Sequence, residues 1–318
     1  MKKIIAMTML IVMLLSLTAC GSAPADDGKY TIGICQLATH DALDAATNGF
    51  MQAVKDQLGD ENVEFDLQNA AGDANTCASI VNAFVASNVD LIMANATPAL
   101  QAAQSATGDI PILGTSVTEY GVALDIKDFN GTVGGNVSGT SDLAPLEEQA
   151  AMLQEWFPNA KNVAMIYSSA EPNSKYQVDT MKKLLEEKGY TCQFFAFTDS
   201  NDMQAVVNGA CEFADVIYLP TDNAVASSTD IIDGICRPAG IPIIAGEEGI
   251  CAGCGVATLS ISYYDLGYKT GEMAAKILKG EADISTMAIE YAPAVKKYNP
   301  EICAELGLTA PEGYKAIG

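Results

Sequence analysis

Basic residues are scarce in this chain of 318 residues. Lysine and arginine number 17 against 40 aspartates and glutamates, which leaves a formal net charge of −23. Arg237 is the only arginine, His40 the only histidine and Trp156 the only tryptophan. So acidic a chain repels phosphate backbones, which argues against nucleic acid as a partner. A single arginine excludes a cleft that clamps phosphate with several guanidinium groups, and a single histidine excludes multi-histidine metal sites.

Long apolar runs are also scarce, and the exception lies at the N-terminus. An almost unbroken apolar stretch, residues 4–17, follows Lys2 and Lys3 and is too short to span a bilayer comfortably. Leu-Thr-Ala-Cys at 17–20 then resembles a bacterial lipobox. We predict a lipoprotein signal peptide over 1–19, lipidation of Cys20 and a tether over 20–29, with the protein anchored outside the cytoplasm on the bacterial cell membrane. The alternative is an ordinary secretory signal in which Cys20 is incidental.

Eight further cysteines remain of the nine in the chain. Most of them lie inside apolar runs, where cysteine acts as a small hydrophobic residue. Cys251 and Cys254 form a CxxC motif, which can be a redox pair or half of a zinc site. This motif lies in a glycine-rich loop before a strand and has no partner motif, so neither a redox enzyme nor a metal site is expected.

Apolar runs of strand length alternate with helical patterns from Tyr30 onward. The predicted strands fall into two sets, 30–36, 63–69, 90–95 and 111–115, then 162–168, 191–197, 215–219 and 241–245. Helices are predicted over 41–58, 73–87 and 173–188, with a further one opening at Thr97 and Pro98. Alternation with buried-type strands predicts an α/β fold with parallel sheets covered on both faces.

The chain also repeats itself, which indicates two similar lobes. The stretch at 90–97 matches that at 215–222, and the stretch at 110–116 matches that at 241–247. A glycine-rich segment, 131–140, reads as a crossing or hinge, and the helix over 264–279 is expected to return to the first lobe. We therefore expect two doubly wound lobes, the first from 30–138 plus 263–284 and the second from 139–262 plus 285–318.

Ligands of doubly wound sheets bind beyond the carboxyl ends of the strands. The residues expected there are rich in hydroxyl and amide groups, with a few acids and no base. In the first lobe they are Gln36, His40, Ala96, Thr97, Ser116 and Thr118. In the second lobe they are Ser169, Glu171, Asn173, Ser174, Thr221, Asp222, Asn223, Glu247 and Glu248.

This composition suits a zwitterionic ligand. Hydroxyl groups and helix N-termini can hold a carboxylate, for which Ser116, Thr118, Thr97 and the 168–174 loop are the candidates. Asp222 and the Glu247–Glu248 pair are the candidates for an ammonium group. An amino acid is therefore favoured over a sugar, because sugar sites more often use tryptophan and arginine.

Each candidate also has a structural interpretation. Thr97 and Asn173 are good helix caps, Asp222 could form an Asx-turn, and the Glu247–Glu248 pair could be a solvated turn. Tyr264 and its neighbour Tyr263 belong to the core or form an aromatic wall. No nucleophile elbow, P-loop or dinucleotide fingerprint occurs, so we expect a protein that performs no catalysis and needs no cofactor.

Nine motifs resemble, in order, those of a known family. They are ICQLATHDALDAATNGF, QNAAGD, ANATPALQA, TSVTE, NVSGTSD, YSSAEPNS, PTDNAVASS, AGEEG and ISYYDLGYKTGEMA. They are similar to those of ABC transporter substrate-binding proteins of the tryptophan/tyrosine type. The resemblance implies a type I periplasmic-binding fold, a monomer that delivers an aromatic amino acid to a permease and its ATPase, and closure around the ligand. A sugar or nucleoside ligand, or a sensor of the same fold, remains the alternative.

Overall fold

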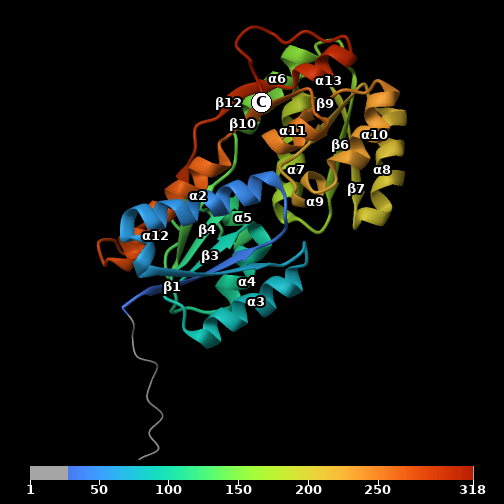
Figure 1. Ribbon diagram of the computed structural model, residues 1–318. Helices are drawn as coiled ribbons and strands as arrows, with labels where there is room; N and C mark the ends of the chain where they lie inside the picture. The colour runs from blue at the N-terminus through green and yellow to red at the C-terminus, as the bar shows by residue number, and fades with distance from the viewer. Residues whose placement is uncertain (1–27, 318) are drawn as a thin grey trace, which may run out of the picture.

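The computed structural model describes residues 28–317. The predicted signal peptide, the lipidation site Cys20 and most of the tether lie outside the described residues. Within residues 28–317, no helix combines the length and apolar character that a membrane crossing requires. The described chain forms two lobes, one above the other in Figure 1, with the C-terminus on the upper lobe.

The first lobe contains a six-stranded sheet in the order β11-β5-β4-β3-β1-β2. All neighbouring strands in it are parallel, as the sequence predicts. Its strands are β1 (Tyr30–Gln36), β2 (Val63–Asn69), β3 (Leu91–Asn95), β4 (Ile112–Val117), β5 (Val137–Ser141) and β11 (Glu290–Tyr291). The four predicted strands of the first set agree with β1 to β4 within two residues at each end.

Helices cover both faces of the first sheet. They are α2 (Asp41–Leu58), α3 (Ala74–Ser87), α4 (Thr97–Ala106), α5 (Tyr120–Ala123) and α12 (Tyr263–Leu278), with 3-10 turns η1 (Asp60–Asn62) and η2 (Ile284–Thr286). Side chains along β1 alternate between the two faces of the sheet. Ile32 and Ile34 pack with Phe50 on the face covered by α2 and α12. Cys35 packs with Phe84 on the face covered by α3. The returning helix predicted over 264–279 is α12, which lies along α2 (Figure 1).

The second lobe contains a seven-stranded sheet in the order β13-β12-β10-β9-β8-β6-β7. Only the β10–β12 pair is antiparallel. Its strands are β6 (Asn162–Ser168), β7 (Thr191–Phe197), β8 (Val216–Leu219), β9 (Ile243–Ala245), β10 (Ala257–Ser260), β12 (Val295–Tyr298) and β13 (Lys315–Ala316). Its helices are α6 (Leu146–Trp156), α7 (Pro172–Glu187), α8 (Ser200–Phe213), α9 (Asn223–Ala226), α10 (Thr229–Ala239), α11 (Glu248–Cys254) and α13 (Pro300–Glu305).

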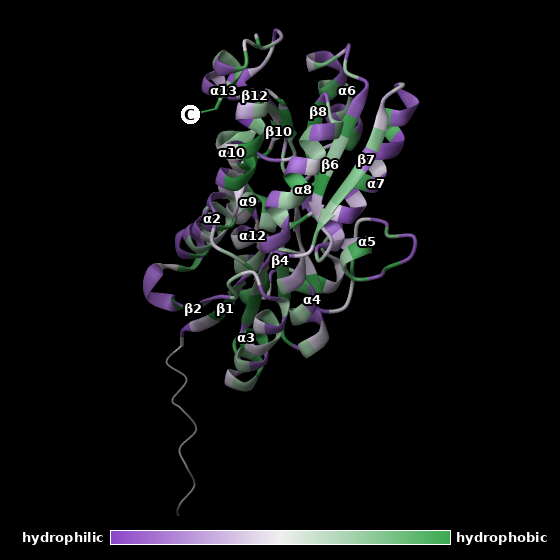
Figure 2. Ribbon diagram, turned by 90° about the vertical axis from the view of Figure 1, so that its right-hand side faces the viewer, coloured by the Kyte–Doolittle hydropathy of each residue, from purple (hydrophilic) through white to green (hydrophobic). Residues whose placement is uncertain are grey.

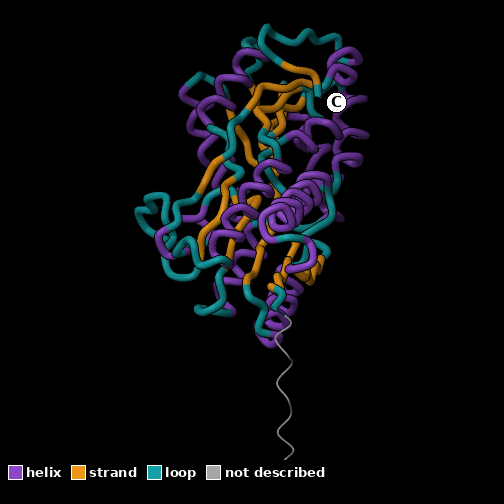
Figure 3. Tube along the Cα trace, turned by 60° about the vertical axis from the view of Figure 1, so that its left-hand side comes forward, coloured by secondary structure: helices purple, strands orange, loops and turns teal. Residues whose placement is uncertain are grey.

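Two mainly parallel sheets in two lobes confirm the predicted fold class. Figure 3 shows the two groups of strands with helices around each, and Figure 2 shows the apolar residues along β6 at the centre of its lobe. Each sheet has one apolar cluster on each face, so each lobe has its own core.

The chain passes between the sheets three times, after β5, after β10 and after β11. The expected lobe boundaries after 138 and 284 therefore fall inside β5 and ahead of β11, both of which belong to the first sheet. The glycine-rich segment was expected to be a crossing, and this was wrong for its last residues, which form β5. At Gly139, with φ of 146°, a Cβ atom would lie 2.1 Å from the Gly114 carbonyl oxygen. Glycine is there because β4 and β5 approach closely, and the crossing begins only at Asp142.

Two helix starts also differ from the predicted ones. The residue that caps α4 is Ala96, with φ of 92°, and Thr97 is the first helical residue. The residue that caps α7 is Glu171, and Asn173 lies inside the first turn. Proline explains the second shift, because Pro172 locks φ in the helical range and favours the first turn, so α7 begins one residue before its predicted start.

Candidate functional site

The ends of several strands and helices enclose a small cavity between the lobes. It is lined by His40, Ala42, Leu43, Ser116, Thr118, Asp142, Asn173, Thr221, Asp222, Asn223, Ala226, Glu247 and Tyr263. The volume open to the centre of a water molecule is about 10 Å³. The two lobes are therefore closed on one another, and ten of the thirteen residues in the wall have polar side chains.

The first lobe contributes Ser116 and Thr118 at the end of β4. The pairing of β4 with β5 shifts register between Gly114 and Val117, and Ser116 has a φ of 53°. Such bulges re-aim side chains, and a left-handed conformation of a residue other than glycine costs of order 1–3 kcal/mol. The Ser116 hydroxyl is buried and has no hydrogen-bond partner. The chain thus holds a strained residue that presents an unpaired hydroxyl group to the cavity.

Asp142 lies where the chain first leaves the first sheet, directly after β5. Its Oδ2 accepts a hydrogen bond from the Tyr263 hydroxyl at 2.9 Å, while its Oδ1 is buried without a partner. Tyr263 is the first residue of α12, so this bond joins two of the three crossings. Burial raises the pKa of Asp142, and the hydroxyls of Thr118 and Tyr263 oppose that rise.

Asp142 was not among the expected site residues, although it follows a strand as the others do. The stretch just before it, 131–140, is glycine-rich and was interpreted as a crossing or hinge, so the strand β5 was not recognised. Recognising β5 would have placed Asp142 at a strand end beside the cleft. Tyr264 was expected instead of Tyr263, yet Tyr264 is 42% exposed and packs against Tyr268 with ring centroids 6.4 Å apart.

In the second lobe, two buried carboxylates hold the N-terminus of α9. Glu171 accepts hydrogen bonds from the backbone N–H groups of Asn223 and Ala224 at 3.1 and 3.0 Å. Asp222 accepts one from the Ser168 N–H at 2.7 Å and one from the Val225 N–H at 2.9 Å. Both carboxylates therefore have structural partners before any ligand is considered.

Asn173 differs from these acids because its single side-chain oxygen has no hydrogen-bond partner. Its Nδ2 donates to Glu171 Oε2 at 3.2 Å and to the Thr221 carbonyl oxygen at 3.2 Å, whereas Oδ1 is buried without a partner. Ser116 Oγ, Asp142 Oδ1 and Asn173 Oδ1 thus all belong to the cavity lining and all lack partners. Buried polar atoms without partners are rare and costly, so three around one cavity indicate a ligand that would satisfy them.

One contact closes the cavity from lobe to lobe. His40 Nε2 lies 3.2 Å from Asn223 Oδ1. Asn223 Nδ2 donates to Glu171 Oε2 at 2.6 Å, so its Oδ1 is an acceptor and His40 Nε2 carries the hydrogen. Burial lowers the pKa of His40, which keeps the imidazole neutral.

The site is rich in acidic side chains. Burial raises the pKa of Glu171 to about 8 and that of Glu247 to about 7, and it also raises the pKa of Asp222. No lysine or arginine lines the cavity. Arg237, on α10, pairs instead with Asp233 and Glu305. A cationic group inside the cavity would therefore be stabilised, and an anionic group would have to rely on hydroxyl and N–H donors.

The sixteen expected ligand residues divide evenly between the cavity wall and its surroundings. Those in the wall are His40, Ser116, Thr118, Asn173, Thr221, Asp222, Asn223 and Glu247. Those outside it are Gln36, Ala96, Thr97, Ser169, Glu171, Ser174, Glu248 and Tyr264. Several of these support the wall from behind, as Glu171 does, and Gln36 bonds within its own lobe to Thr47 at 2.6 Å.

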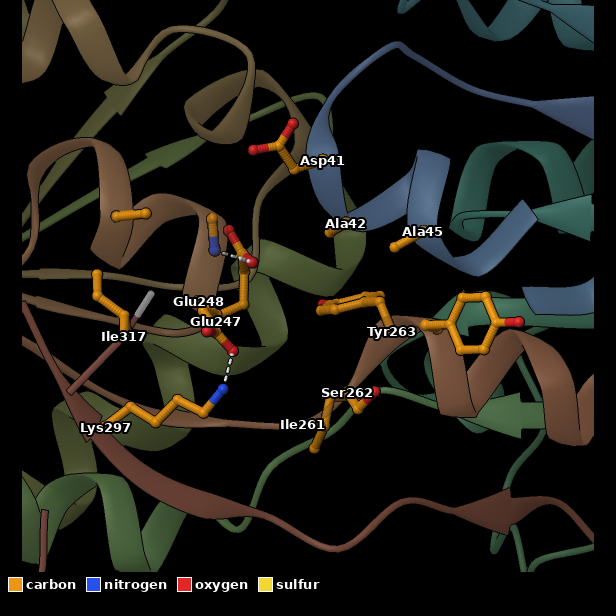
Figure 4. Close-up of a pocket in the computed structure, with 13 residues that line it drawn as sticks. Asp41, Ala42, Ala45, Glu247, Glu248, Ile261, Ser262, Tyr263, Lys297 and Ile317 are labelled. Carbon is orange, nitrogen blue, oxygen red and sulfur yellow. Dashed lines mark hydrogen bonds and ion pairs between the residues drawn. The ribbon is translucent and has the colours of Figure 1, made fainter. Parts of the chain in front are cut away.

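A wider groove of about 490 Å³ lies beside the cavity and shares Ala42, Glu247 and Tyr263 with it. Figure 4 shows the Tyr263 ring between the start of α2 on one side and α11 on the other. Glu248 belongs to this groove, where it forms a 2.6 Å ion pair with Lys297. Glu247 faces the cavity with its oxygens bound to the N–H groups of Gly249 and Ile250, as the cap of α11.

Comparisons with known proteins decide the family. The family model described as ABC transporter substrate binding protein matches residues 31–315. The chain belongs to this family. Its members are binding proteins that typically act outside the cytoplasm, which agrees with the prediction that the chain is not an enzyme.

Two kinds of relative stand out for this substrate-binding protein. It is 37% identical over 279 residues to the tyrosine-binding protein of Clostridioides difficile strain R20291, covering 84% of this chain and 81% of that protein. An ABC domain from Streptococcus pneumonia, solved in complex with L-Trp, is 31% identical and has a TM-score of 0.86, with 91% of this chain and 100% of that chain covered.

A third relative bears on the conformation. The ligand-free, open structure of a substrate binding protein with adhesive properties from Clostridium difficile is 38% identical, covering 91% of this chain and 99% of that chain. Its TM-score is nevertheless only 0.69. Sequence identity is higher and the covered share of this chain is the same, so neither accounts for the lower score. The substrate-binding protein described here is closed, in agreement with the small volume left in its cavity.

Proposed function

We propose that this substrate-binding protein captures an amino acid with an aromatic side chain between its lobes and delivers it to an ABC importer. The names of its relatives support the ligand class, since one is a tyrosine-binding protein and another was solved with L-Trp. The N-terminal motif supports a lipoprotein that is held at the membrane through Cys20. The proposed partners are a permease and its ATPase, and the proposed state is a monomer.

The observation that carries the proposal is the group of three unpaired polar atoms, Ser116 Oγ, Asp142 Oδ1 and Asn173 Oδ1. Two of them can only accept hydrogen bonds, and one bears a charge when ionised. An ammonium group has three donors and a positive charge, so we assign it to Asp142 and Asn173. The sequence suggested Asp222 for this role, but both Asp222 oxygens already accept backbone N–H groups.

The carboxylate of the same ligand needs donors that carry no full charge. The Ser116 hydroxyl is one such donor, and Thr118 lies two residues further along the same strand end. The N-terminus of α2 is another, because His40 caps it without a side-chain hydrogen bond and Ala42 and Leu43 line the cavity. The free N–H groups of a first helical turn attract anions. Hydroxyls and this helix end together replace the missing arginine.

The aromatic ring requires more space than the closed cavity offers. We place it against the Tyr263 ring, on the side where Tyr263 and Ala42 separate the cavity from the wider groove (Figure 4). Offset or edge-on contact between aromatic rings contributes about 0.5–1.5 kcal/mol beyond the area buried. Binding therefore requires the lobes to open for entry and to close again with the ring between them.

A thermal-shift screen of the purified protein against amino acids, sugars and nucleosides tests the ligand class. A ligand at 100 times its dissociation constant stabilises the folded state by about 2.7 kcal/mol, which corresponds to a rise in Tm of about 5 °C or more. We expect L-tyrosine, L-tryptophan or L-phenylalanine to produce this rise. A rise with sugars or nucleosides and none with amino acids would disprove the proposal.

A variant tests the assigned contacts separately. Ser116→Ala removes a hydroxyl that has no partner in the protein, so the ligand-free Tm should stay within about 1 °C of the unmodified protein. Loss of one neutral hydrogen bond to the ligand should weaken affinity about 3- to 10-fold. As a matched control, Ser79→Ala removes a hydroxyl that bonds only to Asn75 within the exposed face of α3, and should leave affinity unchanged. Equal affinities of the two variants would remove Ser116 from the site.

A further inference from the structure

Two thiols of the second lobe face each other across neighbouring helices. Cys211 Sγ, near the end of α8, lies 3.5 Å from Cys236 Sγ, near the end of α10. The two helices pack side by side at the right-hand edge of the upper lobe in Figure 1. A disulfide requires a sulfur separation of about 2.05 Å, so an approach of roughly 1.5 Å separates contact from a covalent bond.

Only one of these two sulfurs can meet a reagent from solution. Cys236 is 1% exposed, whereas Cys211 is partly exposed on the outer side of α8. Cys211 is the only cysteine of residues 28–317 that is not buried. An accessible thiol with a buried partner in contact has the geometry of an attacking and a resolving cysteine.

The CxxC motif does not have this geometry. Cys251 and Cys254 are both buried, and their thiols point to different carbonyl oxygens, those of Gly255 and Ile250. Each sits in the short helix α11 or at its end as part of the apolar core. Proximity in sequence thus singled out one cysteine pair, while the fold brings together a pair 25 residues apart.

We propose that Cys211 and Cys236 are a modification site, at which a disulfide oxidant met outside the cytoplasm forms an intramolecular disulfide joining α8 to α10. In the first step the Cys211 thiolate attacks one sulfur of a small disulfide such as oxidised glutathione. The S–S bond of the oxidant breaks, one thiol leaves with the proton lost by Cys211, and a mixed disulfide remains. In the second step Cys236 loses its proton and attacks the Cys211 sulfur, and the second thiol leaves. Two protein thiols are oxidised, and one external disulfide is reduced to two thiols.

Treatment of the purified protein with oxidised glutathione tests the proposal. Before treatment, iodoacetamide should label Cys211 alone among the cysteines of residues 28–317. After treatment that labelling should disappear, the intact mass should fall by two hydrogens, and peptide mapping without reductant should show Cys211 linked to Cys236. Closing a loop of this length should raise Tm by roughly 5–10 °C, and dithiothreitol should reverse the rise.

Three variants separate this pairing from others. Cys236→Ser should stop at the mixed disulfide and gain the mass of one glutathione, and Cys211→Ser should not react. Cys254→Ser, which removes the thiol of the CxxC motif, should oxidise as the unmodified protein does. The proposal is overturned if the unmodified protein stops at the mixed disulfide, stays reduced, or shows a Cys251–Cys254 link. Peptide mapping of the unmodified protein decides this even if a variant fails to fold.

Discussion

Replacing Asp142 with asparagine removes one charge from the cavity and replaces one acceptor oxygen with an NH2 donor. The side chains have nearly the same shape, and the asparagine oxygen can still accept the hydrogen bond that the Tyr263 hydroxyl donates at 2.9 Å. What changes is the oxygen that has no partner, Oδ1, which we assign to the ligand ammonium. Asp142→Asn therefore removes both the charge and the acceptor that we assign to the ligand ammonium.

The magnitude follows from the burial of Asp142, which is only 4% exposed. A hydrogen bond to a charged group contributes about 1.5–3 kcal/mol, and each 1.4 kcal/mol is a factor of ten in the dissociation constant. Asp142→Asn should thus raise the Kd for an aromatic amino acid about 10- to 150-fold. Removing the buried partner of an ammonium group can cost more binding free energy than this, so the 10- to 150-fold increase in Kd is a lower estimate.

Stability should change in the opposite direction from affinity. Burial raises the pKa of Asp142 above its ordinary value, which means that ionisation at neutral pH opposes folding of the ligand-free protein. Asparagine removes this penalty, so the ligand-free Tm at pH 7 should be equal or higher. The difference should vanish as pH falls below about 4, because the aspartic acid is then protonated in the folded and unfolded states alike.

Isothermal titration calorimetry with L-tyrosine and L-tryptophan, together with Tm measured at pH 7 and pH 4, tests both parts. Asp179→Asn is a matched control, since Asp179 is an exposed residue of α7 that pairs with Lys175 and lies outside the cavity wall. The control should bind as the unmodified protein does. If Asp142→Asn binds within threefold of the unmodified protein, Asp142 does not hold the ammonium and the assignment of the site is wrong.

Three further predictions concern the frame of the site. Asp222→Ala leaves two buried N–H groups without their acceptor, so we expect Tm to fall by several degrees even without ligand. An unchanged Tm with reduced affinity would instead show that Asp222 contacts the ligand. Gly267→Ala would place a Cβ atom 1.9 Å from the Ala46 carbonyl oxygen, so α12 must separate from α2 and unfolding in urea should become easier by more than 2 kcal/mol; an unchanged midpoint would contradict this close packing. His40, the only histidine, should titrate below about 6.5 in the ligand-bound protein by NMR, because burial lowers its pKa. Neutral His40 stabilises the closed state, so this stabilisation is present above pH 6.5 and is lost as pH falls through the lowered pKa. His40→Gln should abolish the pH dependence that His40 causes. A histidine titrating at or above its ordinary pKa would show that the imidazole is not enclosed.

The regular elements could be predicted closely because their signals are local. The strand β6 is an apolar run that begins at Asn162 and ends at Ser168. The helix α2 begins at residue 41 and ends at residue 58, as its periodicity indicates. The strand β5 was missed because it contains the sequence Val-Ser-Gly-Thr-Ser, which is polar and glycine-rich, yet all five residues are buried. Its burial comes from β4, the strand before it in the chain, and from α12, which lies far later in the sequence.

The site could be predicted as a region but not as a set of contacts. The rule that ligands bind beyond strand ends located Ser116, Asn173 and Asp222 together without any coordinates. It could not tell an acid that holds backbone N–H groups, such as Asp222, from one that keeps an oxygen free, such as Asp142. Both follow a strand, and both are buried in the folded protein. The difference lies in which donors surround each carboxylate.

The amino-acid sequence alone specifies two doubly wound lobes, an acidic protein with a single arginine, and the strand ends at which a ligand binds. These properties follow from apolar periodicity, from turn and cap residues, and from composition, all of which act locally along the chain. Which polar atoms already have hydrogen-bond partners follows only from the tertiary structure. It shows that Asp142 has an oxygen without a partner, whereas both oxygens of Asp222 accept hydrogen bonds. It also shows that the sulfur atoms of Cys211 and Cys236 are in contact. These hydrogen bonds and this sulfur contact join atoms from distant parts of the chain, so local sequence patterns do not predict them.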